Sequence, residues 1–462
     1  MRTSLTAAVS SGQIGSEFMK VRLSYPRRIA IGFGLIILIG ALLLMLPISS
    51  VSGRATGLVD ALFTATSATC VTGLVVVDTA VHWSVFGQSV ILVLIQVGGL
   101  GVMMVATLFS LAFRRRIGLS ERTYLQESAA SVQLGGAVRL CKRVLQVTFL
   151  LEGVCAVLLA LRYVPDMGIG KGIYLSVFHS ISAFCNAGFD LLGRDYAPFC
   201  SLAPYVGDPL INFVTMFLIV AGGLGFVVWQ DLYWNRWHWK KYSLHTKIVL
   251  SITLILILLP AVMFWFAERN RGFAGLSGPE SAMAALFQSV TYRTAGFSTV
   301  DANQLSGASR LVGMLLMMIG GSPGSTAGGM KTTTFFVIVL SLVAVVRNRR
   351  TLNSFRRRLD DETLRRACAI CFVYIALVMG ATVMICYAQP FSVEQVLYEV
   401  VSAVNTVGVS MGITPQLSVL SKLVVVSLMY FGRVGVLSIL AAFAGKGKTS
   451  AVQYPVERIP VG

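Results

Sequence analysis

Four short stretches of the sequence share one pattern, and each ends in a single glycine flanked by small or apolar residues. Glycine adopts positive φ and lets backbones approach closely. A turn built on it can aim backbone carbonyls at a common point, and a ring of carbonyls can replace the hydration shell of a cation. The copies read F-T-A-T-S-A-T-C-V-T-G-L at Phe63–Leu74, F-H-S-I-S-A-F-C-N-A-G-F at Phe178–Phe189, F-Q-S-V-T-Y-R-T-A-G-F at Phe287–Phe297 and Y-E-V-V-S-A-V-N-T-V-G-V at Tyr398–Val409.

The spacing of the copies indicates a repeated membrane module. Their glycines, Gly73, Gly188, Gly296 and Gly408, are 115, 108 and 112 residues apart. This period lies outside the common soluble repeats. Each copy is expected to form a short helix that stops in a turn. The third copy has one residue fewer before its glycine, so its helix should differ by part of a turn.

Composition places the whole chain in a membrane. Hydrophobic residues make up 55% and charged residues 13% of the sequence, whereas a soluble domain carries about a quarter charged residues. Eight segments are long enough to cross about 30 Å of hydrocarbon at 1.5 Å per residue. They lie near Ile29–Pro47, Val85–Phe113, Val144–Val164, Leu210–Trp234, Ile248–Ala267, Leu311–Val346, Cys368–Ala388 and Leu417–Ala444.

Most of the positive charge lies in alternate loops. Of the 38 lysines and arginines, 26 lie in residues 20–28, 114–143, 236–247, 347–366 and 446–458. This is the positive-inside pattern, so we expect a protein of the plasma membrane with both termini on the cytoplasmic side. The net charge of +18 therefore indicates attraction to anionic membrane lipid rather than nucleic acid.

One glycine copy lies between the members of each successive pair of spans and is too short to cross. It must enter the membrane from outside and return. Non-helical backbone at that depth is tolerated only where protein buries it or where it lines a wet cavity. We therefore predict an all-α polytopic membrane protein with four M1–P–M2 repeats, comprising eight transmembrane helices and four re-entrant pore loops around a pseudo-fourfold central pore.

The sixth span contains G-G-S-P-G-S-T-A-G-G-M-K at Gly320–Lys331. Five glycines and Pro323 disfavour a helix interior, so the span should break there. A Walker motif is excluded because Met330 precedes Lys331 and no strand comes before it. A tolerated kink and a flexible loop beneath the glycine turns both remain open readings.

A few polar residues lie in apolar surroundings. Arg433 sits deep in the eighth span, either facing the pore or pairing with a carbonyl or with Glu152. Arg293 is expected to salt-bridge the frame of the third turn, and Asp60 to N-cap the first short helix. Glu399 can attract cations at the mouth or be solvated or packed, while His179 is a packing residue rather than a metal ligand. Cys368-x-x-Cys371 has no second pair nearby, so no disulfide or structural metal is predicted.

The four motifs and the eight spans resemble the Ktr/Trk/HKT superfamily of potassium transporters, and the short start and fourth turn are most similar to the membrane subunit of bacterial Ktr systems. The resemblance implies a potassium filter at Cys70, Val71, Thr72, Gly73, Cys185, Asn186, Ala187, Gly188, Thr294, Ala295, Gly296, Asn405, Thr406, Val407 and Gly408. Because the four turns differ and hold one glycine each, they should form fewer ion sites than a fourfold-symmetric filter.

The resemblance also implies a gate below the filter, formed by Gly320, Gly321, Ser322, Pro323, Gly324, Ser325, Thr326, Gly328, Gly329 and Lys331, with Arg433 as a barrier to cations. It implies a homodimer on a cytosolic nucleotide-binding RCK ring, with no cofactor beyond the transported potassium. No catalytic set of residues is found, so an enzyme is not expected. An alternating-access potassium/sodium symporter stays open as an alternative.

The repeats divide the chain into a polar leader at 1–18, whose end before Met19 resembles a cloning remnant, and four modules. The modules cover residues 19–113, 114–235, 236–350 with the gate loop, and 351–445. Residues 446–462 form a C-terminal tail.

Overall fold

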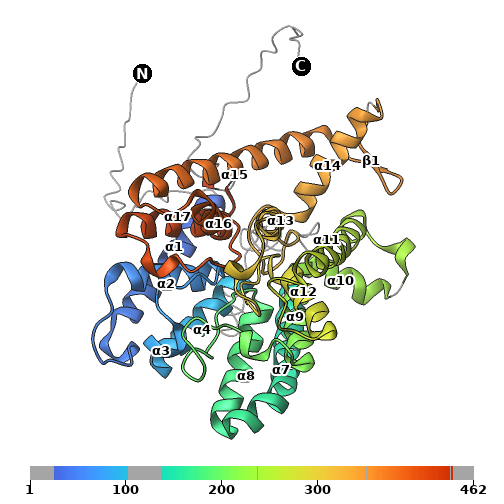
Figure 1. Ribbon diagram of the computed structural model, residues 1–462. Helices are drawn as coiled ribbons and strands as arrows, with labels where there is room; N and C mark the ends of the chain where they lie inside the picture. Colours follow the sequence, from blue (N-terminus) through green and yellow to red (C-terminus); the bar gives the residue numbers. More distant parts are fainter. Residues whose placement is uncertain (1–24, 102–136, 237, 350, 437–438, 441–462) are drawn as a thin grey trace, which may run out of the picture.

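The computed structural model describes residues 25–101, 137–236, 238–349, 351–436 and 439–440, and they are mainly helical (Figure 1). The helices are α1 (Tyr25–Met45), α2 (Leu58–Cys70), α3 (Thr79–His82), α4 (Val85–Leu100), α7 (Ala137–Met167), α8 (Ile169–Phe184), α9 (Pro209–Leu224), α10 (Phe226–Asn235), α11 (Leu244–Glu268), α12 (Gly278–Thr291), α13 (Gly307–Met317), α14 (Thr332–Val346), α15 (Asp361–Ala388), α16 (Val393–Val404) and α17 (Val419–Val434). The strands β1 (Asn353–Ser354) and β2 (Arg357–Arg358) form a small antiparallel hairpin.

Four short helices, α2, α8, α12 and α16, correspond to the four repeated stretches, and we call them the pore helices. The aromatic residue that opens each pattern is fully buried in all four copies (Phe63, Phe178, Phe287 and Tyr398). Burying such a side chain stabilises the fold by about 1.5–3 kcal/mol. At α16 the start is set by a capping box, in which Ser392 and Gln395 each accept the other's backbone N–H at 3.3 Å.

In each module the segment predicted as the second span contains the end of a helix, namely α4, α9, α13 or α17. Among the described residues four helices are long and apolar enough to cross a membrane, and α9 with α10 makes a fifth if that bent pair is one span. Helices α4, α9 and α17 end at Gly101, Gly225 and Gly435, whose φ angles of 88°, 90° and 92° are incompatible with a right-handed helix. The predicted break at Gly320–Lys331 is confirmed, since α13 ends at Met317 and α14 begins at Thr332.

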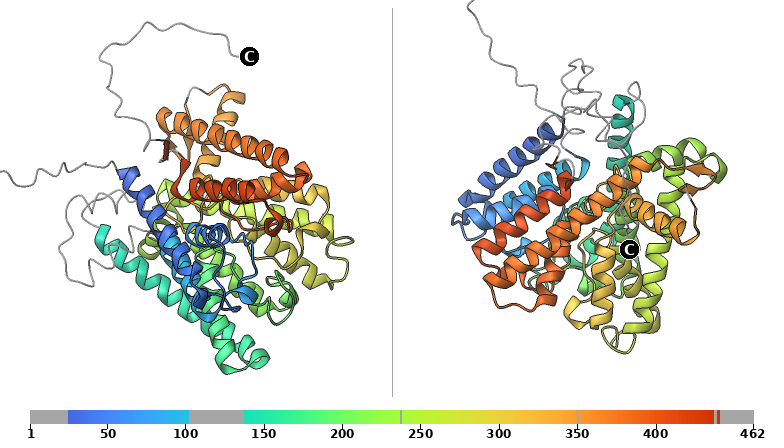
Figure 2. Two further views of the ribbon diagram at one scale, coloured as in Figure 1. Left: turned by 90° about the vertical axis from the view of Figure 1, so that its left-hand side faces the viewer. Right: turned by 90° about the horizontal axis from the view of Figure 1, so that it is seen from above.

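The modules follow one another around the centre in chain order, from blue through green and yellow to red in Figure 1. Figure 2 shows α15 and α17, the first and second helices of the last module, running side by side. An ion pair of 2.7 Å between Lys422 on α17 and Asp60 on α2 joins the last module to the first. The prediction that Asp60 is an N-cap is wrong, because Gly57 occupies that position and Asp60 lies in the first turn.

Several expectations lie outside the described residues. They are the leader at 1–18, the natural start at Met19, most of the basic segment 114–143, and the C-terminal tail at 446–462.

Candidate functional site

The turn after each pore helix has the same backbone conformation in all four copies. The glycines of the predicted filter, Gly73, Gly188, Gly296 and Gly408, are called the filter glycines, and each has a positive φ, between 68° and 97°. The residue two positions before it is also left-handed, with φ of 55° at Val71, 59° at Asn186, 67° at Thr294 and 51° at Thr406. Bulky residues rarely adopt this region, and such backbone costs of order 1–3 kcal/mol. Because a left-handed residue of this kind occurs at the same place in all four turns, the four turns share one constrained conformation.

The four turns close into a ring. A methyl group placed on each filter glycine would collide with the carbonyl oxygen that precedes the glycine of the next copy. The collisions are Gly73 with Ala187 at 2.6 Å, Gly188 with Ala295 at 2.7 Å, Gly296 with Val407 at 2.7 Å, and Gly408 with Thr72. The fourth contact returns to the first copy, so the ring is complete and every step runs in the same sense. Only glycine fits these positions.

A hydroxyl group on each pore helix holds its turn. Ser67 and Ser402 accept hydrogen bonds from the N–H groups of Gly73 at 3.1 Å and Gly408 at 3.0 Å. Ser182 and Thr291 instead donate to the carbonyls of the residues after the glycines, Phe189 and Phe297. These hydroxyls did not figure among the predicted site residues, although a Ser or Thr recurs at this place in every copy of the pattern.

The third copy differs as its length predicted. Its hydroxyl residue lies five positions before the glycine instead of six. In the other copies the residue before the glycine bonds to the carbonyl five positions back at 2.8 Å, as from Thr72 to Ser67. In the third, Ala295 bonds four positions back to Thr291 at 3.0 Å. This bond spans one residue fewer along the chain, which compensates for the missing residue and leaves the glycine in the ring.

A cavity of about 620 Å³ opens on one side of the ring and is lined by all four filter glycines. The acidic residues Asp78, Asp190 and Asp301 also line it, and burial raises the pKa of Asp190 to about 7. Asp78 is fixed by the N–H groups of Ala80 and Val81 at 2.9 Å and of Phe199 at 2.7 Å. The cavity is therefore a vestibule with negative charge in its wall.

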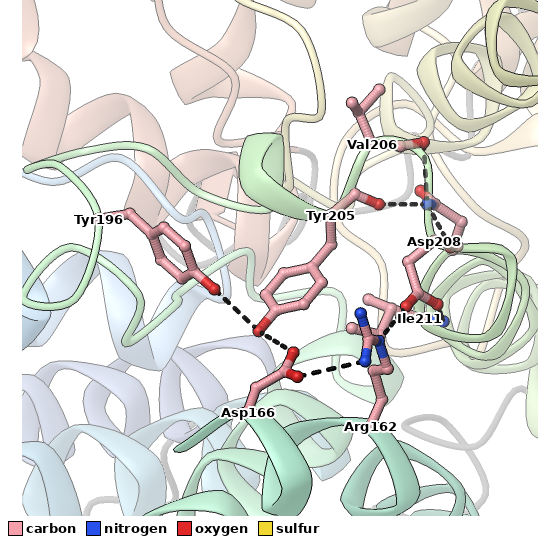
Figure 3. Close-up of polar contacts among 8 residues, drawn as sticks. Arg162, Asp166, Tyr196, Tyr205, Val206, Asp208 and Ile211 are labelled. Carbon is pink, nitrogen blue, oxygen red and sulfur yellow. Dashed lines mark hydrogen bonds and ion pairs between the residues drawn. The ribbon is translucent and has the colours of Figure 1, made fainter. Parts of the chain in front are cut away.

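A polar network holds the segment between the second turn and α9 that forms part of this wall (Figure 3). Arg162 on α7 bonds Asp208 at 2.5 Å and Asp166 at 3.2 Å. Tyr205 donates to Asp166 at 3.2 Å and accepts from Tyr196 at 3.1 Å. Figure 3 shows these side chains converging from the end of α7 and the segment before α9, so the vestibule wall is tied to a spanning helix.

On the other side of the ring lie residues 318–331, which we call the 318–331 loop. The loop contacts the ends of two pore helices: Thr326 donates to the carbonyl of Phe184 at 3.1 Å, and Asn405 accepts from the N–H of Met330 at 3.4 Å. Its base is closed by a 2.8 Å bond from the N–H of Gly320 to the carbonyl of Met330. The loop is thus held beneath the turns rather than out in the lipid.

The same loop also docks on the break between α9 and α10. Ser322 and Thr326 donate their N–H groups to the carbonyls of Gly223 at 3.0 Å and Gly222 at 3.2 Å. In return, the N–H of Phe226 donates to the carbonyl of Gly324 at 2.9 Å. Backbone groups that the interrupted helix leaves free are therefore satisfied by the loop.

Arg433 joins the 318–331 loop to the first module. Its guanidinium donates to the carbonyl of Thr326 in the loop and to the carbonyls of Gly98 and Gly99 at the end of α4. Of the two partners expected for a structural Arg433, the carbonyl is observed and Glu152 is not. Glu152 instead accepts from Gln96 at 3.2 Å.

Lys331 is a second cation in this region. Its ammonium group donates to the carbonyls of Ala327 at 2.8 Å and Gly328 at 3.4 Å within the same loop. Within the described ranges, no carboxylate lies within 4.0 Å of Lys331 or Arg433. Two basic side chains without an acidic partner within 4.0 Å therefore lie on the far side of the ring from the acidic vestibule.

Three further predicted residues take structural positions. His179 bonds Tyr163 and the N–H of Leu191 at 3.0 and 3.1 Å, which confirms its packing role. Glu399 is 1% exposed and accepts from Ser410 and Thr414, so it is not solvated. Arg293 is 8% exposed, and no carboxylate reaches it among the residues described, so the predicted salt bridge is wrong. It lines a small cavity beside Gly223 and Gly321 instead.

Comparison with known proteins identifies the family. The model of the family described as "TrkH: Cation transport protein" matches residues 32–451. The chain is 39% identical to the potassium/sodium uptake protein NtpJ of Enterococcus hirae, over 96% of this chain and 98% of the relative. It is 40% identical to Ktr system potassium uptake protein B of Bacillus subtilis, over 94% and 96%.

Solved structures show the same fold. The potassium transporter TrkH from Vibrio parahaemolyticus matches with a TM-score of 0.72 at 18% identity, covering 92% of this chain and 86% of that one. The sequence resemblance is thereby confirmed, together with the all-α membrane fold. The chain belongs to the TrkH family of cation transport proteins, which here includes its Ktr-type relatives.

Proposed function

We propose that this protein is the channel-like, ion-translocating subunit of a Ktr-type potassium uptake system in a bacterial plasma membrane. The observation that carries the proposal is the closed ring of four turns, in which each filter glycine abuts the carbonyl of the next copy. A dehydrated potassium ion is held by such carbonyls. The names of the Bacillus subtilis and Enterococcus hirae relatives support potassium as the ion.

The direction of the pore helices favours a cation. Each pore helix ends directly before its turn, so its carboxyl end faces the ring. That end carries the negative pole of the helix dipole, which stabilises positive charge by about 0.3–1 kcal/mol per helix. The acidic vestibule adds to the attraction on the outer side, because carboxylates raise the local concentration of cations.

The 318–331 loop with Arg433 and Lys331 is proposed as the gate. It lies on the opposite side of the ring from the vestibule and brings two positive charges to that side. An ion that leaves the ring must displace the loop or pass those charges. The chain is further proposed to act as a homodimer on a cytosolic nucleotide-binding RCK ring, as the Ktr system names of its relatives suggest.

A potassium/sodium symporter that alternates access is the second candidate, and the relative named for both ions motivates it. Such transporters are commonly built from inverted repeats. The same-sense closure of four turns favours a fixed central pore instead.

Rescue of potassium uptake in a bacterial strain that lacks its own uptake systems tests the proposal. Rescued growth at low potassium is expected, and it should disappear when Gly296 is replaced by serine. Flux against voltage, measured with and without sodium in reconstituted vesicles, separates the candidates. A current that requires sodium in fixed proportion to potassium would favour the symporter and overturn the channel-like mechanism.

A further inference from the structure

Helix α10 leaves the direction of helix α9 almost at a right angle. The two helices are separated only by Gly225 and are bent by 96°. Helix α9 exposes Phe213 and Phe217, at 56% and 50%, as expected for a surface that faces lipid. Helix α9 begins next to the vestibule wall, so α10 turns off at the end away from the vestibule, in a direction close to parallel with the membrane plane.

The residues exposed around the end of α10 have the composition of a membrane interface. Tyr233 and Trp234 are 75% and 62% exposed, and Trp239 in the following loop is 44% exposed. Such aromatic residues concentrate at the level of the lipid headgroups. The guanidinium of Arg143 on α7 lies 5.9 Å from the Tyr233 ring and 6.0 Å from the Trp234 ring. We call Arg143, Tyr233, Trp234, Trp239, Lys240 and Lys241 the α10 patch.

Several contacts hold residues 238–243, which include the two lysines. The hydroxyl of Tyr242 donates a hydrogen bond to the carbonyl of Arg236. The N–H of Ser243 donates one to the carboxylate of Asp231 at 2.9 Å. The ring of Trp239 packs edge-on against Tyr242 at 5.9 Å and against Phe355 of the β1–β2 hairpin at 6.5 Å. The lysines are therefore presented on a preformed surface.

The charge of the patch is unbalanced. In the part of the chain that the structure describes, no carboxylate lies within 4.0 Å of Lys240 or Lys241. The adjacent acid, Asp231, already binds Ser243 and Asn235. The neighbouring hairpin adds the exposed residues Arg356, Arg357 and Arg358. A partner with negative charge at headgroup depth fits this arrangement.

We propose that the α10 patch binds the phosphate headgroup of an anionic phospholipid from the leaflet opposite the vestibule. The lysines and Arg143 neutralise the phosphate, and the aromatic rings lie between the headgroup and the acyl chains. Membrane lipid is favoured over a protein partner because the right-angle bend holds the patch along the membrane surface, where Tyr and Trp side chains are most stable.

Lipid bound at the α10 patch would also affect the position of the 318–331 loop, and this part of the inference rests on the proposed function. Gly225 joins α10 to α9, and its neighbours bond the loop directly: Phe226 donates to Gly324 at 2.9 Å, and Leu224 accepts from the hydroxyl of Ser322. A lipid that holds α10 against the membrane therefore favours one position of the loop over another.

Binding is tested by native mass spectrometry of the purified protein with phosphatidylglycerol or phosphatidylcholine. The double variant Lys240→Gln/Lys241→Gln should lose phosphatidylglycerol affinity by roughly tenfold or more, since one cation near an anionic surface accounts for about fivefold. Phosphatidylcholine binding should not change. The matched control, Arg365→Gln/Arg366→Gln at the exposed start of α15, removes two charges from the same end of the molecule and should keep the preference.

Equal binding of the two lipids to the native protein, or unchanged phosphatidylglycerol binding in the lysine variant, would overturn the proposal. If that variant keeps its lipid preference but loses its response to a cytosolic partner, the patch docks a protein instead. Potassium flux in vesicles with and without phosphatidylglycerol tests the coupling separately. If the protein binds lipid in a charge-dependent way but carries no potassium flux, the lipid site is supported and the proposed function is contradicted.

Discussion

Among single residues, the filter glycines face the tightest geometric limits. Gly296 has a φ of 84°, and a methyl group there would lie 2.7 Å from the carbonyl oxygen of Val407. A side chain would therefore be strained by its own backbone, at about 1–2 kcal/mol, and would also push a proposed ion ligand out of place.

We expect Gly296→Ser to lower potassium uptake by roughly tenfold or more, since 1.4 kcal/mol corresponds to a factor of ten, and to weaken rejection of sodium. Uptake of potassium in the presence of competing sodium measures both effects. Gly53→Ser is the matched control, because Gly53 has a φ of 67° but no described atom within 4 Å of its added side chain. Unchanged affinity and sodium rejection in serine variants of all four filter glycines would refute the filter assignment.

Arg433 combines a positive charge with a physical link between the 318–331 loop and α4. Arg433→Ala removes both, and we expect a folded protein with a higher basal potassium flux. Arg433→Lys separates the two roles, because an ammonium group keeps the charge but cannot reproduce the planar fork of the guanidinium. Low flux in the lysine variant would indicate that the positive charge is the barrier. High flux in both the alanine and the lysine variant would indicate that the hydrogen bonds between the 318–331 loop and α4 are what matters. Failure of the alanine variant to assemble would favour a structural role.

Among the secondary-structure elements, the breaks in the second helices decide how the loop is held. Gly101 and Gly225 occupy equivalent breaks with nearly equal φ of 88° and 90°. A methyl group on Gly225 would lie 2.6 Å from the hydroxyl oxygen of Ser322 and 2.8 Å from the carbonyl oxygen of Pro323, whereas none of the described atoms lies within 4 Å of one on Gly101.

This difference predicts that Gly225→Ala changes gating and Gly101→Ala does not. Both variants should lose stability through backbone strain of about 1–3 kcal/mol. Only the former displaces the 318–331 loop. Thermal unfolding in detergent measures the loss of stability expected in both variants. Potassium flux in vesicles measures the change in gating expected only for Gly225→Ala. Equal flux in the two variants would show that contact with α9 does not position the loop.

The loop itself gives a second prediction at this level. Deleting part of residues 322–329 should raise potassium flux and reduce its dependence on a cytosolic partner, because the loop occupies the side of the ring opposite the vestibule. Flux in vesicles with and without the partner is the measurement. If the deletion variant folds and its flux is native, the loop is not a gate and is better interpreted as a tolerated kink.

Across the whole molecule, the ring is closed by contacts between the first and last modules. Lys422 and Asp60 form the ion pair of that seam, with side chains 15% and 35% exposed. Because solvent screens the pair in part, its coupling energy should be at most about 1 kcal/mol. A double-mutant cycle with Lys422→Gln and Asp60→Asn, followed by thermal unfolding, measures it. Additive effects of the two substitutions would show that packing of α17 on α2 holds the seam without the ion pair.

The sequence by itself determined the features that depend on near neighbours. A buried aromatic residue, a hydroxyl group and a glycine recur at fixed spacing in each copy, so the four turns and even the shortened third copy were predictable. Glycines and Pro323 likewise marked the break at Gly320–Lys331, because helix propensity is a local property. The exclusion of soluble proteins followed from composition alone.

Only the tertiary structure decided which distant groups meet. One chain does not reveal that Gly408 abuts Thr72, or that Arg433 bonds carbonyls of α4, since these pairings depend on how the modules pack around the centre. The salt bridge expected for Arg293 failed for this reason, whereas the N-cap expected for Asp60 failed because α2 begins three residues earlier, after Gly57. The helix ends at Gly101, Gly225 and Gly435 were not predicted, because a single glycine with φ near 90° ends a helix and hydropathy averaged over a span is insensitive to one backbone angle.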